Sequence, residues 1–194
     1  MDFDRDRVGT ALSALGEQLR LAGERYELVV IGGSGLLALG LIDRTTRDVD
    51  LVALRREGEL IDPRPLPQSL LDARDRVADD FGLPRNWLNA APSGLLDFGL
   101  PAGFADRLER RDYGLALTVW LASRLDQIHF KLYALADHSP GSKHDLDLRA
   151  LEPTREELVS AARWAITHDP SEGFRLELTG ALEYLGVEDA DLGA

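Results

Sequence analysis

The segment spanning residues 27–54, ELVVIGGSGLLALGLIDRTTRDVDLVAL, constrains the fold of this chain more than any other part. Residues 28–31 form a short apolar, β-branched run that is typical of a buried strand. A Gly-Gly-Ser turn and a short apolar stretch follow, and residues 48–54 have the composition of a second strand. The segment therefore predicts a strand, a glycine turn, a short helix and another strand.

Two aspartates lie on the expected second strand, at Asp48 and Asp50. Because side chains alternate along a strand, both carboxylates point to the same face. Hard divalent cations such as Mg²⁺ prefer carboxylate oxygens, and phosphoryl transfer uses these cations to neutralise charge on phosphate. Arg44 and Arg47 are nearby and can supply positive charge instead. A metal site and an arginine-paired strand edge both remain open.

The glycine turn, Gly32-Gly33-Ser34, is a second feature with two interpretations. Glycines allow a ligand to approach the backbone closely, and the amides at the following helix start favour anions. Ser34 adds a hydroxyl group to such a site. Many strand-to-helix turns, however, use a glycine pair for steric reasons alone. The turn by itself is consistent with either a phosphate site or a purely structural role.

Composition excludes several classes of protein. The chain has 194 residues, of which 44% are hydrophobic, and this favours one globular domain or one domain with a small helical appendage. The chain has no cysteine, so disulfides and thiolate metal sites are excluded. The first residues lack a signal-peptide pattern and no apolar run reaches a membrane-span length, so we expect a cytoplasmic protein with no membrane association. The net charge of −12 disfavours non-specific binding to nucleic acid, and we expect no DNA partner.

The coarse order of elements is α-β-α-β-α-β followed by helices only. This order predicts an α/β (α+β) fold in which helices flank a small mixed sheet and the C-terminal half is helical. We expect residues 1–122 to form the core and residues 123–194 to form a helical part packed on it as one compact unit. The expected strands are 28–31, 48–54 and 115–121, and the expected helices are 8–19, 35–41, 69–80, 125–136, 145–151, one opening at 153, and 172–185.

Lys131 lies in the expected helix 125–136, at the edge of an apolar stripe that includes Leu132 and Leu135. At 100° per residue it is about 40° beyond Leu135. A lysine in this position can follow the core into a cleft or extend its amine to solvent. Both arrangements remain open from the helical geometry alone.

The order and spacing of the first two features resemble a known signature. Ile31-Gly32-Gly33-Ser34, thirteen residues, and then Asp48-Val49-Asp50-Leu51 resemble the motif of the DNA polymerase beta-like nucleotidyltransferase superfamily. The segments TTRDVD at 45–50, KLYA at 131–134 and DLDL at 145–148 resemble the AbiEii-type nucleotidyltransferases. These are toxins of type IV toxin–antitoxin systems and include the MenT-like enzymes that modify tRNA. The resemblance covers roughly residues 27–170.

The resemblance implies a Mg²⁺- or Mn²⁺-dependent enzyme that uses a nucleoside triphosphate (NTP). Asp48 and Asp50 would bind the metal and act in catalysis. Gly33, Ser34 and Arg47 would hold the triphosphate. The reaction would move a nucleoside monophosphate to a hydroxyl acceptor, such as the 3′ end of a tRNA. A cognate antitoxin or toxin protein would be the partner.

The helical half supplies two further residues by the same resemblance. Lys131 would contact phosphate or the attacking hydroxyl, and Asp147 would be a catalytic carboxylate. The superfamily often has a third acidic residue on a later strand, but the expected strand here, LALTVWL, has none. Asp145 or Asp147 can supply the missing charge. His144, in the same segment, is an additional candidate for a base.

Two other functions remain open from the sequence. The first is nucleotide transfer to a partner protein, as in the related minimal nucleotidyltransferases that act as antitoxins, because an acidic surface suits a protein partner better than RNA. The second is a nucleotide-binding or regulatory module that retains the fold without turnover. The missing acidic residue on the third strand favours this second alternative.

Overall fold

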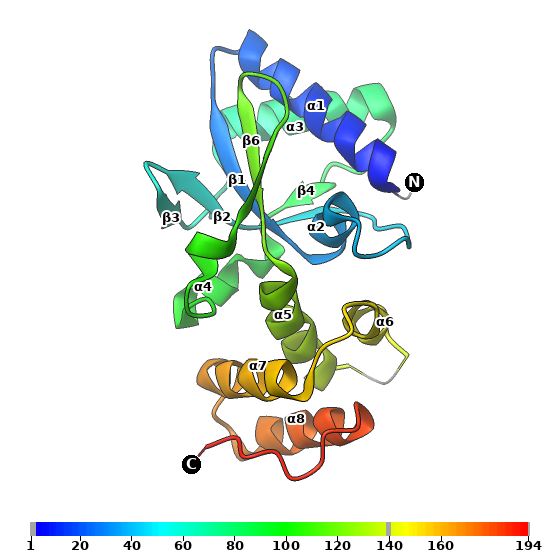
Figure 1. Ribbon diagram of the computed structural model, residues 1–194. Helices are drawn as coiled ribbons and strands as arrows, with labels where there is room; N and C mark the ends of the chain where they lie inside the picture. Colours follow the sequence, from blue (N-terminus) through cyan, green and yellow to red (C-terminus); the bar gives the residue numbers. More distant parts are fainter. Residues whose placement is uncertain (1–2, 139–140, 194) are drawn as a thin grey trace. The chain divides into compact units, whose positions relative to one another are not determined.

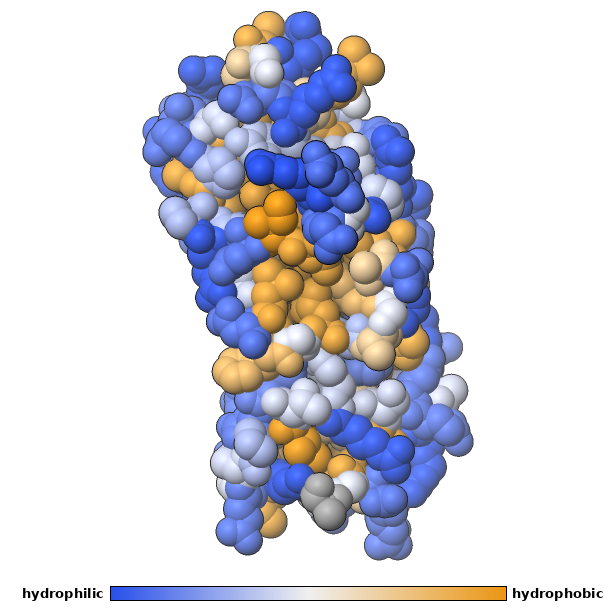
Figure 2. Space-filling view, turned by 90° about the vertical axis from the view of Figure 1, so that its left-hand side faces the viewer, coloured by the Kyte–Doolittle hydropathy of each residue, from blue (hydrophilic) through white to orange (hydrophobic). Residues whose placement is uncertain are grey.

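A computed structural model describes residues 3–138 and 141–193 of the chain. The chain divides into two compact units. The first comprises Met1–Asp97 and Gly103–Ala122, and the second comprises Phe98–Ala102 and Ser123–Ala194. Among the described residues, no helix is long and apolar enough to cross a membrane. Hydrophilic residues cover most of the face shown in Figure 2, and apolar residues reach the surface in patches among them.

The first unit is built on a mixed sheet with the strand order β3-β2-β1-β6-β5, and β4 pairs with β2 outside this path. The central strand β1 is antiparallel to β2 and parallel to β6. At the end of β1, Ile31 lies opposite Asp50 of β2. The strands are β1 (Tyr26–Ile31), β2 (Val49–Arg56), β3 (Glu59–Ile61), β4 (Leu88–Asn89), β5 (Glu109–Asp112) and β6 (Leu117–Leu121).

Two long helices, α1 (Arg5–Leu21) and α3 (Gln68–Phe81), lie side by side and pack on one face of this sheet (Figure 1). Gly16 of α1 approaches β6 so closely that a Cβ atom there would lie 3.3 Å from Cβ of Leu117. Tyr26 of β1 forms a 2.7 Å hydrogen bond with Ser69 of α3. Leu117 and Tyr26 therefore point to the helix-covered face, and their neighbours in sequence point to the opposite face.

The helix α2 (Gly32–Leu39) begins directly after β1 and ends at Gly40, whose φ of 74° is in the left-handed region that favours glycine. Arg5 fixes this end, because its Nε donates a 2.9 Å hydrogen bond to the carbonyl oxygen of Leu37. The helix α2 thus follows directly from β1 at its start and is held by Arg5 at its end. Farther along the chain lie two 3-10 helices, Ala91–Gly94 and Phe104–Arg107, and the short helix α4 (Leu95–Phe98).

The second unit is helical. Its helix α5 (Arg124–Ala136) packs against α6 (Lys143–Ala150), α7 (Arg155–His168) and α8 (Glu172–Tyr184). Ser123, Ser142, Thr154 and Ser171 each cap one of these helices by accepting a backbone N–H with the side-chain oxygen.

An arginine ties the start of α5 to α7. The Arg124 guanidinium donates to Glu157 at 2.7 and 3.1 Å and also to the carbonyl oxygens of Leu151 and Glu152. Hydrogen bonds from the Arg124 side chain are the main reason that the pKa of Glu157 lies below its usual range. This contact holds the loop between α6 and α7 against the start of α5.

The predicted fold class is confirmed, since helices flank a small mixed sheet and the residues after 123 form helices. The sequence pattern missed β3, β4 and β5. These strands have two to four residues, and β5 is ERRD, entirely exposed and without an alternating apolar pattern. The third expected strand begins at Leu117 rather than at residue 115. Edge strands of this kind are paired by tertiary contacts that local composition does not encode.

Candidate functional site

The glycine turn contacts the carboxylate of Asp50. Gly32 has a φ of 77°, which L side chains rarely adopt. A Cβ atom at this position would lie 3.0 Å from Oδ2 of Asp50. The absence of a side chain at residue 32 therefore allows the turn and the carboxylate of the neighbouring strand to be in direct contact.

Gly33 provides a second close approach, here to the loop that precedes β2. A Cβ atom at Gly33 would lie 2.9 Å from Oγ1 of Thr46 and 3.4 Å from a terminal guanidinium nitrogen of Arg44. Because Gly33 has no side chain, the side chains of Thr46 and Arg44 can reach the start of α2. The steric and the ligand-binding interpretations of the turn are compatible, because the closely packed groups are themselves polar.

Ser34 is the buried polar group of the turn. It is 1% exposed, and within the described residues its Oγ has no hydrogen-bond partner. A buried hydroxyl without a partner is uncommon and marks a place where a ligand can supply the missing bond. Ser34 lies in the first turn of α2, where backbone amides and the helix dipole favour an anion.

Asp50 lies on β2, and Asp48 immediately precedes the first residue of this strand, which begins at Val49 rather than at residue 48. Val49 between them is fully buried, and both aspartates are partly exposed. Thr46 Oγ1 lies 3.5 Å from Oδ1 of Asp48, at the limit of a hydrogen bond, and Asn89 Nδ2 donates to Oδ1 of Asp50 at 3.1 Å. Each carboxylate is thus held by a neutral polar side chain.

Asn89 is a site residue that the sequence did not reveal. It belongs to β4, in register with Asp50, and its own Oδ1 accepts a 2.9 Å hydrogen bond from the backbone of Ala91. This second bond fixes the amide orientation, so that the NH₂ group points to Asp50. A two-residue strand inside a loop gives no periodic signal, so only the three-dimensional pairing identifies this contact.

Arg44 is the second residue whose position the sequence did not determine. Arg47 was the arginine predicted to hold the triphosphate, and its side chain is exposed. Arg44 is partly buried and lies beside Gly33. Sequence distance alone could not separate the two, because the loop between α2 and β2 has no regular structure.

The donor set on this face fits a cation that keeps several waters. Among residues 3–138 and 141–193, no group of three or more His, Cys, Asp or Glu side chains could hold a metal. Mg²⁺ is commonly bound by one or two carboxylates together with substrate phosphates and water. Two carboxylates beside a buried, unpartnered hydroxyl meet this requirement once a phosphate is present.

The structure agrees with the sequence that the strand expected third along the chain, β6, carries no acidic residue. This strand pairs with β1 rather than with β2. Asp50 lies between Ile31 of β1 and Asn89 of β4, whose amide donates to it. Neither of these two residues places a third carboxylate beside Asp50.

Lys131 and Asp147 form an ion pair inside the second unit. Lys131 Nζ lies 2.7 Å from Oδ2 of Asp147, and the two side chains are only 5% and 0% exposed. Lys131 is thus buried rather than extended to solvent, which decides between the two arrangements that helical geometry left open. Asp48 and Asp50 belong to the first unit, and this pair belongs to the second.

His144 lies near this pair, and its imidazole is uncharged at neutral pH. Burial lowers the pKa of its imidazole to about 4, and the positive charges of Lys131, Lys143 and His138 add to the effect, whereas Asp147 opposes it. Its Nδ1 is buried and has no hydrogen-bond partner within the described part of the chain. A neutral imidazole with a free nitrogen can accept a proton, which keeps His144 a candidate base.

Asp145, by contrast, is fully engaged in structural bonds. Burial raises the pKa of its carboxyl, but hydrogen bonds from the Gly141 amide, the Tyr184 hydroxyl and the Arg149 guanidinium, each at 2.8 Å, outweigh burial and lower the pKa overall. These three bonds tie α6 to α8 and to the loop before α6. Of the two aspartates that the sequence left open, Asp147 is the one paired with Lys131.

Comparison with known proteins gives one match. Residues 10–141 match a family described as a nucleotidyltransferase of unknown function (DUF6036). The matched region contains the glycine turn, Asp48, Asp50 and Lys131, and it ends before Asp147. No curated protein and no solved structure matches the chain.

Proposed function

Because this chain belongs to that nucleotidyltransferase family, we propose that it transfers a nucleoside monophosphate from an NTP to a hydroxyl group of RNA, at the 3′ end of a tRNA. The observation that carries the proposal is the contact between the glycine turn and Asp50, next to the buried, unpartnered Ser34 hydroxyl. A phosphate site and a carboxylate pair are thereby adjacent on one rigid sheet.

The triphosphate binds at the start of α2 in this proposal. The Ser34 hydroxyl donates to a phosphate oxygen and so gains the partner that it lacks. Gly33 leaves room for this approach, and Arg44 and Arg47 offset the phosphate charge, with Arg44 the closer of the two to the turn. The helix dipole adds to the attraction.

Asp48 and Asp50 would hold Mg²⁺, or Mn²⁺, beside the phosphates. The cation would supply charge neutralisation for the α-phosphate and its leaving group. Asn89 keeps the Asp50 carboxylate in place by donating to one of its oxygens, and this leaves Oδ2 on the side of the glycine turn.

The chemical step is a substitution at the α-phosphorus. The acceptor hydroxyl oxygen forms the new P–O bond, and the bond from the α-phosphorus to the bridging oxygen breaks. Pyrophosphate leaves with that electron pair, and the hydroxyl proton passes to a carboxylate or to water. Positioning and electrostatic stabilisation account for most of the acceleration in such reactions.

Lys131 and Asp147 are included in the proposal by resemblance. Lys131 would contact phosphate or the attacking hydroxyl, and Asp147 would hold the lysine amine, to which it is already paired. As an alternative to the carboxylate or water, His144 would accept the proton of the attacking hydroxyl, since its imidazole is uncharged at pH 7. These roles are tested separately from those of Asp48 and Asp50.

The test is transfer of label from α-³²P-labelled NTPs to a tRNA pool in the presence of Mg²⁺. We expect labelled tRNA with the wild-type protein and none with Asp48→Asn/Asp50→Asn. The control is Asp72→Asn/Asp80→Asn, which changes the charge equally on exposed positions of α3. Equal labelling by wild type and the Asp48/Asp50 variant would refute the proposed site.

The same incubation distinguishes the alternative acceptors. The net charge of −12 favours a protein partner over a long RNA footprint. Transfer to protein would appear as a fixed mass increase of the partner in intact mass spectrometry, with no label on RNA. A module without turnover would give neither product, and calorimetry would then show whether it binds NTP at all.

We further propose that the activity acts as a toxin held in check by a cognate antitoxin protein, as the resemblance implies. Induced expression of the wild type alone should arrest bacterial growth. Expression of Asp48→Asn/Asp50→Asn should not, and co-expression of the neighbouring gene with the wild type should restore growth. Normal growth with a soluble, catalytically active protein would contradict the toxin role.

A further inference from the structure

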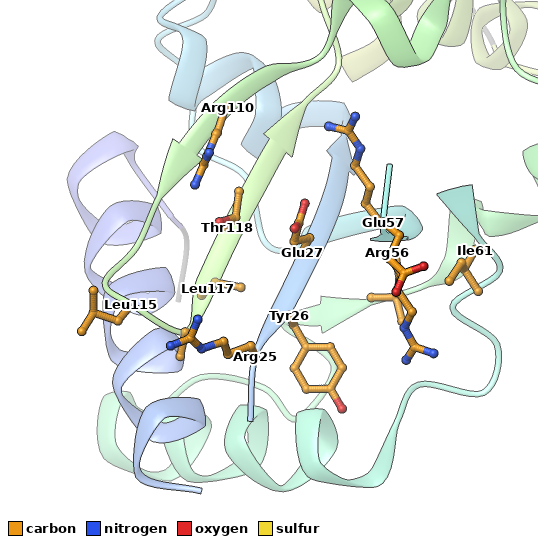
Figure 3. A pocket seen from close by; sticks show the side chains of 13 residues that line it. Arg25, Tyr26, Glu27, Arg56, Glu57, Ile61, Arg110, Leu115, Leu117 and Thr118 are labelled. Atoms are coloured by element: carbon orange, nitrogen blue, oxygen red, sulfur yellow. The ribbon is translucent and has the colours of Figure 1, made fainter. Parts of the chain in front are cut away.

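We propose that an arginine-lined hollow on the first unit binds consecutive phosphates of a short single-stranded RNA and leads that strand toward Asp48 and Asp50. The inference rests on the proposed function, because it identifies where the acceptor binds. The hollow, hereafter the sheet hollow, has a volume of about 410 Å³ (Figure 3). Its arginines are Arg25, Arg55, Arg56 and Arg110.

The arginines come from three separate segments of the chain and line one depression. Arg25 precedes β1, Arg55 and Arg56 end β2, and Arg110 lies on the edge strand β5. Figure 3 shows Arg110 at one side of the hollow, Arg56 at the other and Arg25 near its lower end. Cations distributed in this way match a chain of phosphates better than a single anion.

The charge of the hollow contrasts with that of the whole protein. The chain carries a net charge of −12, whereas the hollow is lined by four arginines and by only two acidic residues, Glu27 and Glu57. Within the described residues, Arg25, Arg55 and Arg56 form no ion pair, and Arg110 is paired with Asp112 at 3.0 Å. Local positive charge on an otherwise acidic protein favours binding of a polyanion at this place.

A tryptophan orders the floor of the hollow. The Arg55 guanidinium lies 3.9 Å from the ring centroid of Trp120, and that of Arg110 lies 5.9 Å from it. Trp120 Nε1 donates a 2.7 Å hydrogen bond to the carboxylate of Glu27, which is one of the two acidic residues that line the hollow. The Arg55 guanidinium thus lies over the ring, and because its Nε donates to the carbonyl oxygen of Gly58 at 3.3 Å, its terminal NH₂ groups remain to donate to phosphate oxygens.

The strand register places Trp120, over which the Arg55 guanidinium lies, and Asp50 on the same face of the sheet. Trp120 is in register with Val29, and Ile31, two residues farther along β1, lies opposite Asp50. Side chains two residues apart on a strand share a face, so Trp120 and Asp50 do as well. This is the face opposite α1 and α3.

The distance suits a strand only a few nucleotides long. Glu27, at the hollow, and Ile31, at the carboxylates, are four residues apart on β1, or roughly 13 Å at 3.3 Å per residue. A single strand whose phosphates contact the hollow therefore reaches the carboxylates with its terminal nucleotides. A double helix is much wider, so a frayed or single-stranded 3′ end fits best.

The expected salt dependence of RNA binding follows from the release of counterions from the phosphates. Three unpaired arginines that each neutralise one phosphate give a slope of about −2 for log K against log salt concentration, at 0.7 per contact for single strands. Removing two of them should reduce the slope by about 1.4. This change in slope separates phosphate contacts from general effects on folding.

The experiment measures fluorescence anisotropy of a short fluorescein-labelled single-stranded RNA across a salt series. The variant is Arg25→Ala/Arg56→Ala, which replaces exposed side chains of the hollow. The matched control is Arg20→Ala/Arg76→Ala, which makes the same charge change at exposed positions of α1 and α3. We expect a weaker, flatter salt dependence for the hollow variant and an unchanged one for the control.

Other results overturn the proposal without touching the proposed function. Equal loss of slope in the hollow variant and the control would show that net charge alone governs binding. An RNA affinity unchanged by the hollow variant would place the acceptor elsewhere. Tighter binding of a poly-glutamate peptide than of RNA, lost in the same variant, would assign the hollow to a protein partner.

Two further measurements distinguish a failure of the RNA-binding proposal from a failure of the proposed transferase function. Asp48→Asn/Asp50→Asn should retain RNA binding that depends on Arg25 and Arg56, even though it transfers no label. Arg25→Ala/Arg56→Ala should retain Mg²⁺-dependent NTP binding in calorimetry and should lose transfer mainly through a raised KM for RNA. NTP binding lost in the hollow variant would contradict a separate acceptor site.

Discussion

Replacing Lys131 with methionine is expected to destabilise the second unit by about 3–5 kcal/mol, because it leaves the Asp147 carboxylate buried without its cation. The two side chains are 5% and 0% exposed and 2.7 Å apart, so solvent can replace little of the lost interaction. Against a typical total of roughly 5–15 kcal/mol, this is a large loss. Methionine keeps the length of the side chain, so the effect reports the charge.

The double variant Lys131→Met/Asp147→Leu should recover most of that stability. Two apolar side chains of similar size remove both desolvated charges together, and such replacements are neutral or stabilising by about 1–4 kcal/mol. Urea unfolding followed by far-UV circular dichroism measures each variant, and the double-mutant cycle yields the coupling energy. Arg20→Met serves as the control, since Arg20 and Glu17 are 49% and 54% exposed and should contribute little.

The cycle also separates a structural from a catalytic role for the pair. A double variant that is stable but transfers no label assigns Lys131 and Asp147 to catalysis. A stable double variant with full transfer shows that they only hold α5 to α6. A change below about 1 kcal/mol for Lys131→Met would refute the reasoning, because a buried carboxylate cannot lose its cation at so small a cost.

Three other substitutions test separate features. Gly33→Val should abolish NTP binding in calorimetry, since its Cβ would lie 2.9 Å from Oγ1 of Thr46, whereas Gly9→Val, with nothing within 4 Å, should bind normally. The pKa of His144 is 6.5 in the unfolded chain and about 4 in the folded protein. Between these two pH values, the unfolded chain therefore binds a proton that the folded protein does not. Stability measured by urea unfolding should therefore fall from pH 6.5 to pH 4, and His144→Gln should flatten that dependence; an equally steep fall in the variant would contradict it. Trp87→Ala should cost about 3–5 kcal/mol, because the indole is fully buried, and a loss below about 1 kcal/mol would contradict the described packing.

Local patterns predicted the elements whose side chains repeat with a clear period. Residues 28–31 gave β1, the aspartate pair gave the start of β2, and the apolar stripe around Lys131 gave α5. The same patterns could not give β4 or β5. Both are short edge segments that exist because a neighbouring strand pairs with them, and such pairing is a non-local property.

The candidate site shows the same division. Sequence order and spacing linked the glycine turn to Asp48 and Asp50, since an alternating strand fixes which side chains share a face. The contact of Asn89 with Asp50 depends on a loop returning beside β2, which is long-range in sequence. The position of Arg44 beside Gly33 likewise depends on how an irregular loop packs.

The sequence by itself therefore determined the fold class, the glycine turn and the neighbouring pair of aspartates, because these follow from periodicity and from residue chemistry over a few tens of residues. Only the tertiary structure decided that Lys131 is buried against Asp147 and that four arginines from three separate segments of the chain line the sheet hollow. Burial and long-range proximity depend on how distant segments pack. No local window of residues contains that information.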